Sequence, residues 1–145
     1  MAGNYTFKTI DDLKADIQGG VLSHEGYKAV ASKLKERFGF SRVAITLRGS
    51  VSASDNNWAA MLYDGSEFYF SKSYPVHIVD RVGGGDSFGA GLIYAALNKF
   101  TPRDALEFAT AASCLKHSIE GDANHVTVDE VKALVGGDGS GRVQR

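Results

Sequence analysis

A run of glycines followed by an acid, set between an apolar segment and a helical pattern, constrains this chain more than any other feature. Gly83, Gly84 and Gly85 directly precede Asp86. Residues 76–79 alternate in polarity as a short strand does, and apolar residues recur at helical spacing after the glycines. The glycines are therefore predicted to open a helix. Backbone N–H groups at such an end, with no Cβ to block close approach, form a cradle for phosphate oxygens.

Asp86 is predicted to do something other than bind phosphate. A carboxylate among phosphate-binding donors repels the ligand, but it is well placed to take a proton from an attacking hydroxyl group. The segment lacks the dinucleotide pattern G-x-G-x-x-G and the P-loop pattern, because Phe88 stands where the first needs glycine and Ala90 where the second needs lysine. A tight strand-to-helix turn without a ligand is the structural alternative.

The segment from Asp80 to Asp86, which reads D-x-x-G-G-G-D, resembles the second signature of the ribokinase-like carbohydrate kinase family. The resemblance implies that Gly83, Gly84 and Gly85 form an anion hole for the transferred phosphoryl group, and that Asp86 is the catalytic base. It also implies ATP as the phosphoryl donor, Mg2+ on the phosphates and a sugar hydroxyl as the acceptor.

Two further segments are similar to the nucleotide site of that family. Residues 43–49 resemble a strand that ends in a nucleotide-contacting loop, and residues 108–112 resemble an alanine-rich helix beside the adenine. The resemblance implies nucleotide contacts from six residues: Arg48, Gly49, Gly83, Gly85, Thr110 and His117. A solvated loop position is the alternative for Arg48, and an interaction with the helix dipole is the alternative for His117.

Within the family, residues 52–58 and 116–124 are most similar to 2-keto-3-deoxygluconate kinases. The resemblance covers roughly residues 11–135, but only the C-terminal part of a family member. The N-x-x-E motif that helps to place magnesium in the family is absent, since Phe7 stands three positions after Asn4. No metal ligand is therefore assigned to this chain.

The resemblance implies an α/β fold, the C-terminal part of a ribokinase-like three-layer αβα sandwich without the N-terminal half and the lid. We expect such a fragment to bind ATP, to lack most contacts to a sugar acid, and to be inactive without the missing half. Two alternatives remain: a nucleotide-binding or interaction module without turnover, and another sugar or nucleoside kinase of the same family.

Composition excludes several classes of function. The chain has 145 residues, 43% of them hydrophobic, and a net charge of -1. This length suffices for one core, and the charge gives no electrostatic footprint for nucleic acid or an anionic membrane. Cys114 is the only cysteine, which excludes an intrachain disulfide and is typical of a reducing cytosol. Without a signal peptide or a membrane-length apolar run, a cytoplasmic location is expected. The histidines lack the spacing of zinc ligands, so no zinc site is predicted.

Local patterns predict one α/β domain over residues 1–135 and a flexible glycine-rich tail over residues 136–145. Helices are predicted at 13–17, from Ser23 to a stop at Gly39, after Thr101 and after Thr127. The second of these has an apolar face of Tyr27, Val30, Ala31, Leu34 and Phe38. Residues 43–47 are predicted to form a buried parallel strand, and residues 58–63 and 67–71 a hairpin.

Three smaller predictions concern single positions and the sheet edge. Trp58 is expected to pack in the core. Asp80 is expected either to bind a cation or to hold the backbone in an Asx turn. An incomplete sheet leaves an open strand edge and apolar surface, so the chain is expected to associate with itself or with a partner.

Overall fold

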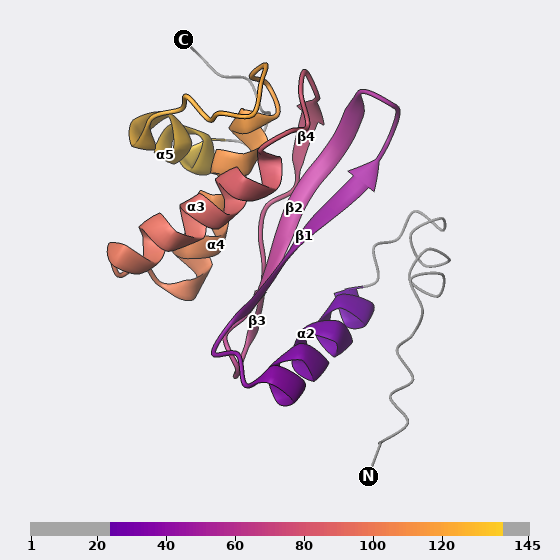
Figure 1. Cartoon of the computed structure of the whole chain (residues 1–145), viewed down its shortest axis with the longest axis vertical. Helices are drawn as coiled ribbons and strands as arrows, with labels where there is room; N and C mark the ends of the chain where they lie inside the picture. The colour runs from indigo at the N-terminus through magenta and orange to yellow at the C-terminus, as the bar shows by residue number, and fades with distance from the viewer. Residues whose placement is uncertain (1–23, 138–145) are drawn as a thin grey trace.

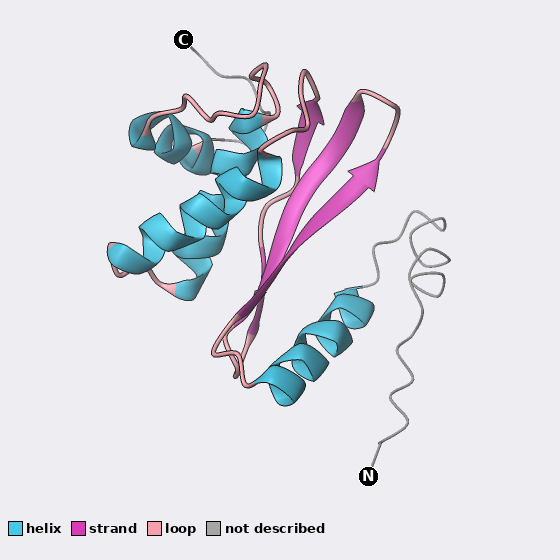
Figure 2. Ribbon diagram, viewed as in Figure 1, coloured by secondary structure: helices cyan, strands magenta, loops and turns pink. Residues whose placement is uncertain are grey.

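The computed structural model describes residues 24–137 as three layers, with a four-stranded sheet between helices (Figures 1 and 2). The strands are β1 (Val43–Ser50), β2 (Asp55–Tyr63), β3 (Phe68–Phe70) and β4 (Tyr74–His77). On one side of the sheet lies α2 (His24–Phe38), and on the other lie α3 (Gly84–Leu97), α4 (Pro102–Lys116) and α5 (Val128–Gly136). The predicted α/β class is confirmed. The helix predicted at 13–17 and the cap at Ser23 lie outside the described residues.

The sheet is built around β2, and its strand pairs are antiparallel throughout the described residues. β2 pairs with β1 on one edge and with β3 and β4 on the other. The predicted hairpin between β2 and β3 is confirmed. In its turn, Oδ1 of Asp64 accepts the N–H groups of Ser66 and Glu67, each at 2.8 Å, and Gly65 has a φ of 99°. The turn is therefore stabilised by its own residues, as the sequence pattern predicts.

The prediction of a parallel strand at 43–47 is wrong for the described residues, because β1 runs antiparallel to β2. The continuous apolar run has another cause. Leu47 belongs to a core cluster with Ala31 of α2 on one face of the sheet, while Ala44 packs on the other face against a cluster that includes Phe88 of α3. A strand covered on both faces needs apolar side chains at successive positions, whichever way its neighbour runs.

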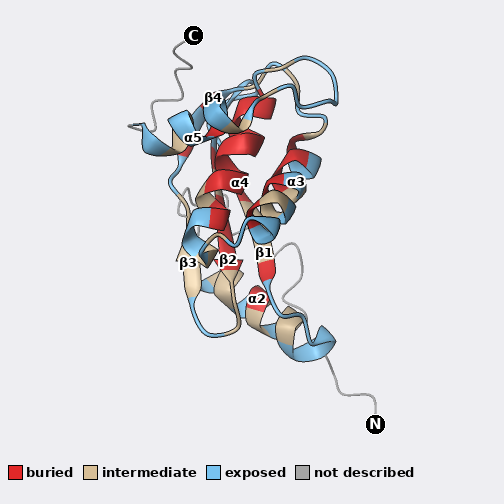
Figure 3. Cartoon of the chain, turned by 90° about the vertical axis from the view of Figure 1, so that its left-hand side faces the viewer, coloured by how far each residue is buried: buried red, intermediate tan, exposed pale blue. Residues whose placement is uncertain are grey.

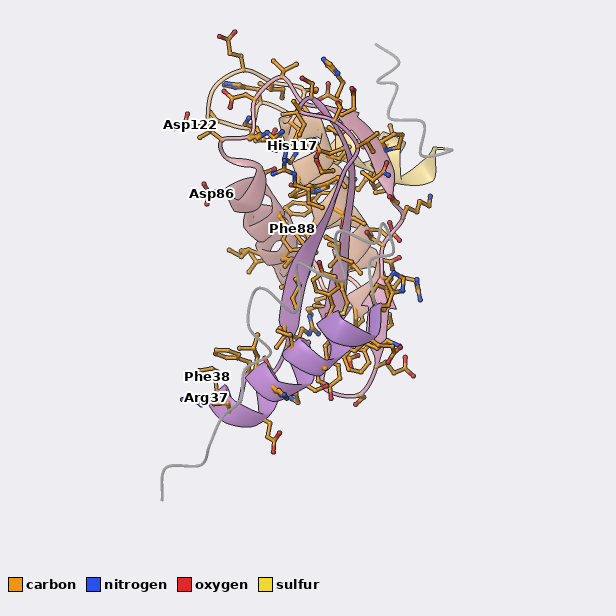
Figure 4. The ribbon with its side chains drawn as sticks, turned by 90° about the vertical axis from the view of Figure 1, so that its right-hand side faces the viewer. Arg37, Phe38, Asp86, Phe88, His117 and Asp122 are labelled. Atoms are coloured by element: carbon orange, nitrogen blue, oxygen red, sulfur yellow. The ribbon has the colours of Figure 1, made fainter. Side chains whose placement is uncertain are left out.

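The helix α2 ends where the sequence predicts. Gly39 has a φ of 68°, and its N–H donates to the carbonyl of Lys35 at 2.8 Å. Ala31 is fully buried, as expected of the apolar face. Phe38 departs from the prediction: its side chain is 56% exposed and stacks on Phe40. Figure 4 shows why, since Phe38 lies at the end of α2 and points away from the sheet.

The starts of α4 and α5 follow the predicted capping residues. The Thr101 side chain caps α4, with Pro102 in the first turn, and Thr127 and Glu130 form the capping box of α5. Gly136 is the last residue of α5, so the helix reaches the first residue of the predicted tail, and the flexibility of that tail stays a prediction. Residues 138–145 lie outside the described part of the chain.

The helices α3 and α4 form the closest packed pair. A Cβ atom on Gly91 of α3 would lie 2.7 Å from Cα of Ala109, so the two backbones touch. Buried positions run along most of α4 (Figure 3). Between residues 24 and 137, no helix is both long enough and apolar enough to cross a membrane. The α3–α4 contact brings the C-terminal end of α4 to the N-terminal end of α3, where the candidate site lies.

Candidate functional site

The glycine segment forms the turn that leads into α3. Gly83 is the N-cap residue, with φ 80° and ψ -2°, and α3 begins at Gly84 with Asp86 in its first turn. The prediction that the glycines open a helix is thus confirmed. A positive φ of this kind favours glycine. The space at Gly83 is closed as well, because a Cβ atom there would lie 2.0 Å from the carbonyl oxygen of Asp122.

The three glycines differ in what surrounds them. A Cβ atom on Gly84 would lie 2.7 Å from Cε1 of His117, whereas one on Gly85 would meet no atom within 4 Å. Gly85 also has no positive φ. Packing and backbone conformation therefore account for Gly83 and Gly84, but they do not account for Gly85.

The backbone N–H groups next to this open space are also without partners among the described residues. Among the described residues, the N–H groups of Gly85 and Asp86 have no hydrogen-bond acceptor, while the N–H of Gly84 lies 3.4 Å from the carbonyl of Arg81. These groups sit at the positive end of the α3 dipole. Two unpaired donors beside a position without a side chain can receive an anion.

Asp80 holds the glycine segment on one side. Its Oδ1 accepts the N–H of Val82 at 3.0 Å, and its Oδ2 accepts the N–H of Gly121 at 2.9 Å. These hydrogen bonds, that from Val82 first, lower the pKa of Asp80. Of the two roles considered for Asp80, the Asx turn is confirmed. The same carboxylate also ties the glycine segment to the loop that follows α4.

The C-terminal end of α4 is hydrogen-bonded to the glycine segment. The carbonyl of His117 accepts the N–H groups of Val79 at 2.8 Å and Asp80 at 3.2 Å. Oγ of Ser113 donates to the carbonyl of Gly84 at 2.7 Å. The loop from 79 to 84 is therefore anchored at several backbone groups by two residues of one helix end.

His117 is buried beneath the glycine segment, with only 4% of its surface exposed. Its ring centroid lies 4.5 Å from that of Trp58, and its Nδ1 lies 2.7 Å from the carbonyl of Ser113. Because a carbonyl only accepts, Nδ1 carries the proton. Burial lowers the pKa of His117, against the opposing effect of the Ser113 hydrogen bond. The imidazole is thus neutral at pH 7, and Trp58 packs in the core as predicted.

Replacement of His117 by glutamine is expected to flatten the pH dependence of stability below pH 6.5. The pKa of this imidazole lies below its unfolded value, so between the two values the unfolded chain binds more protons. Its contribution to the free energy of unfolding is complete above about pH 6.5 and is lost as the pH falls, by up to about 1.4 kcal/mol per unit. Urea unfolding at pH 7, 6 and 5 measures this slope, and equal slopes for both proteins would contradict a neutral buried ring.

Asp86 projects outward from the first turn of α3 (Figure 4). It is exposed, and its carboxylate makes no hydrogen bond to any residue between 24 and 137. His117, in contrast, points into the interior in the same view. A carboxylate that is free, solvated and next to unpaired N–H groups can accept a proton from a molecule bound over Gly85.

The other residues predicted to contact the nucleotide lie in β1 and in or at the end of α4. Arg48 is exposed near the end of β1, where its Nε donates to Oδ1 of Asn56 at 3.1 Å. Strand register sets it opposite Trp58, on the sheet face that carries α4. Gly49 follows it in β1. Thr110 is fully buried and donates to the carbonyl of Leu106 within α4. Nucleotide contacts from Arg48, Gly49, Thr110 and His117 stay predictions.

Sequence reasoning missed two residues that hold the site together. Ser113 binds both Gly84 and His117, and its spacing of four residues before His117 on one helix could have indicated this. Asn124 donates to Oγ of Ser87 in α3. No local sequence pattern predicts the contact between Asn124 and Ser87, because the two residues are far apart in the sequence.

A metal site is a separate question. Within residues 24–137, no group of three or more His, Cys, Asp and Glu side chains is placed to hold a metal ion. Mg2+ is usually held by one or two carboxylates together with the phosphates of a substrate, so no Mg2+ ligand is assigned to the described residues.

Comparison with known proteins identifies the family. Residues 13–128 match the pfkB family carbohydrate kinase. A 2-dehydro-3-deoxygalactonokinase of Haloferax volcanii is 31% identical over 137 residues, which cover 91% of this chain and 40% of that protein. The crystal structure of 2-dehydro-3-deoxygluconokinase from Thermotoga maritima is 43% identical, with a TM-score of 0.77, over 79% of this chain and 35% of that one.

A third relative was solved with a nucleotide. An Escherichia coli protein assigned as ribokinase II, in complex with ATP and Mg2+, is 29% identical with a TM-score of 0.51, over 53% of this chain and 25% of that one. The chain thus spans well under half the length of each of these relatives. The family match includes the whole glycine segment, α3 and α4. Both the sequence match and the structural likeness confirm the predicted resemblance: the chain belongs to the pfkB family of carbohydrate kinases.

Proposed function

We propose that this chain carries the phosphate-binding site and the catalytic base of an ATP-dependent sugar kinase. The observation that supports this best is the open space over Gly85. A glycine that neither packing nor backbone conformation requires, next to two N–H groups without acceptors, is suited to the close approach of a phosphoryl group. Gly83 and Gly84 then shape the turn that aims those amides.

The chemistry follows from this geometry. A sugar hydroxyl attacks the γ-phosphorus of ATP in line, and its proton passes to the carboxylate of Asp86. The N–H groups at the start of α3, together with the helix dipole, stabilise the charge on the transferred phosphoryl group. Magnesium, when bound, neutralises charge on the nucleotide phosphates. ATP as the donor is supported by the family and by the Escherichia coli relative that was solved with ATP.

For the acceptor we propose a 2-keto-3-deoxy sugar acid, such as 2-keto-3-deoxygluconate. Two relatives are named for kinases of such compounds, which the names call 2-dehydro-3-deoxy sugars. A nucleotide-binding module without turnover is the second candidate for the chain alone, since it matches only 35% of the length of the Thermotoga maritima structure. Nothing in the site requires a nucleic acid or a membrane.

The decisive test is nucleotide binding by two matched glycine variants, measured by calorimetry with ADP and ATP. Gly85 and Gly89 both lie in α3, and a Cβ atom on either meets nothing within 4 Å of the protein. Gly85→Ala is expected to weaken binding by about 10- to 100-fold, the value of one hydrogen bond to a charged group. Gly89→Ala, one turn further on, is expected to bind normally. Equal affinities in both variants, or no binding by the parent chain, would remove the proposal.

We also propose that the chain associates through the side of the molecule that carries β1 and α3. Within residues 24–137, β1 pairs with β2 alone, and Ile93 and Leu97 of α3 are 64% and 78% exposed. An open strand edge and exposed apolar side chains both favour contact with another polypeptide. Light scattering is expected to show a mass that rises with concentration, and a strictly monomeric chain would contradict this.

A further inference from the structure

We infer that His117 is a positioning residue for phosphoryl transfer, because its imidazole contacts both Trp58 and Gly84 and sets the place of the first turn of α3. This inference rests on the proposed function, since that turn carries Asp86 and the amides over Gly85. It differs from a direct contact to the nucleotide, because the ring acts through Gly84.

The contacts run without a break from the sheet to the helix. Trp58 belongs to β2, the strand that pairs with all the others, and its ring lies 4.5 Å from the imidazole. The same imidazole also meets Gly84, where an added Cβ atom would lie 2.7 Å from Cε1 and 2.8 Å from Nε2. The ring therefore lies directly against the backbone of the first residue of α3.

Ser113 fixes both partners of this contact. Its carbonyl receives Nδ1–H of His117 at 2.7 Å, and its hydroxyl donates to the carbonyl of Gly84 at 2.7 Å. The imidazole can neither rotate nor withdraw without losing the first bond. Gly84 is thus held by a hydrogen bond from Ser113 and by contact with Cε1 and Nε2 of a neutral ring.

A displacement of Gly84 reaches the reacting groups within the same helical turn. Asp86 follows two residues later, and the N–H of Ser87 closes that turn on the carbonyl of Gly83 at 2.9 Å. The carboxylate and the unpaired amides therefore move as one body. A misplacement of about 1 Å can cost on the order of 10²-fold in rate.

The charges around the ring fit a spacer better than an acid or a base. Trp58 from β2, Gly84 from α3 and Ser113 from α4 are uncharged. The charged groups that act on His117 are Lys116, beside it in the chain, and Arg81 from the glycine segment, and both oppose protonation. The imidazole therefore acts as a neutral, rigid group that sets the position of Gly84 by packing against it.

The test compares His117→Ala, Gly84→Ala, the double variant and a control in the full chain. Val131→Ala is the control, because Val131 is 2% exposed in α5 and belongs to the core cluster that contains Trp58. Amide resonances of Gly85 and Asp86, measured by NMR on labelled protein without ligand, report the position of the turn. ATP affinity, measured by calorimetry, reports its consequence, because ATP carries the phosphoryl group that the amides over Gly85 receive.

His117→Ala is expected to shift both amide resonances and to weaken ATP binding by about 10-fold, close to the value of one hydrogen bond to a charged group. Val131→Ala is expected to lower the melting temperature without either effect. Gly84→Ala alone forces a methyl group into the imidazole, so it should shift the resonances most, and adding His117→Ala should return them toward those of the parent chain. Such non-additivity is the signature of direct contact.

Amides of Gly85 and Asp86 that shift no more in His117→Ala than in Val131→Ala would overturn the inference, as would additive effects in the double variant. If His117→Ala does not fold, His117→Asn replaces it, since the shorter side chain keeps a donor but leaves a gap beside Gly84. Absence of ATP binding by the parent chain would count against the proposed function alone, because the ligand-free resonances still decide the positioning role.

Discussion

Replacement of Asp86 by asparagine is expected to lower phosphoryl transfer by about 10²- to 10⁴-fold, the usual contribution of a general base. The measurement is made in a protein that joins this chain to the rest of the family fold, with ATP and 2-keto-3-deoxygluconate, by following ADP release. The amide has nearly the shape of the carboxylate but cannot take the proton of the attacking hydroxyl. Affinity for ADP is expected to stay equal or to rise, since a negative charge beside the phosphates is removed.

Asp129→Asn serves as the matched control. Asp129 is exposed and lies in the first turn of a helix, α5, as Asp86 does in α3. The control is expected to keep full turnover, because Asp129 has no role in the proposed chemistry. Full turnover by Asp86→Asn would show that the base is another group, whatever the affinity for ADP.

Gly83→Ala is expected to reduce the free energy of unfolding by roughly 2–5 kcal/mol, the sum of a left-handed conformation without glycine and of overpacking. The φ of 80° opposes any side chain. The added methyl carbon would also start 2.0 Å from the carbonyl oxygen of Asp122. A loss of this size is a large part of the stability of a typical domain, and urea unfolding followed by circular dichroism measures it.

Gly121→Ala separates the two causes. Gly121 has a φ of 83°, but a Cβ atom there meets nothing within 4 Å. Its replacement is therefore expected to cost only the conformational part, about 1–2 kcal/mol. Equal losses at the two positions would mean that the contact between Gly83 and Asp122 contributes nothing.

The features that the sequence predicted well depend on residues close together in the chain. The stop of α2 at Gly39 needs only a residue that accepts a positive φ. The caps at Thr101 and Thr127 need a side chain that reaches an amide three residues ahead. The hairpin turn needs Asp64 and a glycine. Each of these is visible in a window of a few residues.

The features that the sequence predicted badly depend on what lies across the fold. An apolar run such as 43–47 indicates that both faces of the strand are covered by other elements. It does not indicate whether the neighbouring strand runs parallel or antiparallel. Helical spacing predicted that Phe38 is covered, but the sheet does not extend to it. Periodicity records which side of an element is apolar, whereas the extent of its cover is set by other elements.

The sequence by itself determined that a glycine turn opens a helix bearing Asp86, and its signature was enough to indicate the kinase family that the comparisons then confirmed. Only the tertiary structure separated three glycines that look equivalent in the sequence. A Cβ atom would meet Asp122 at Gly83 and His117 at Gly84, whereas at Gly85 it would meet no atom of residues 24–137 within 4 Å. The reason is physical: the atoms that close the first two positions come from the end of α4 and the loop beyond it, roughly thirty to forty residues away, so no local pattern could reveal which glycine stays open to a ligand.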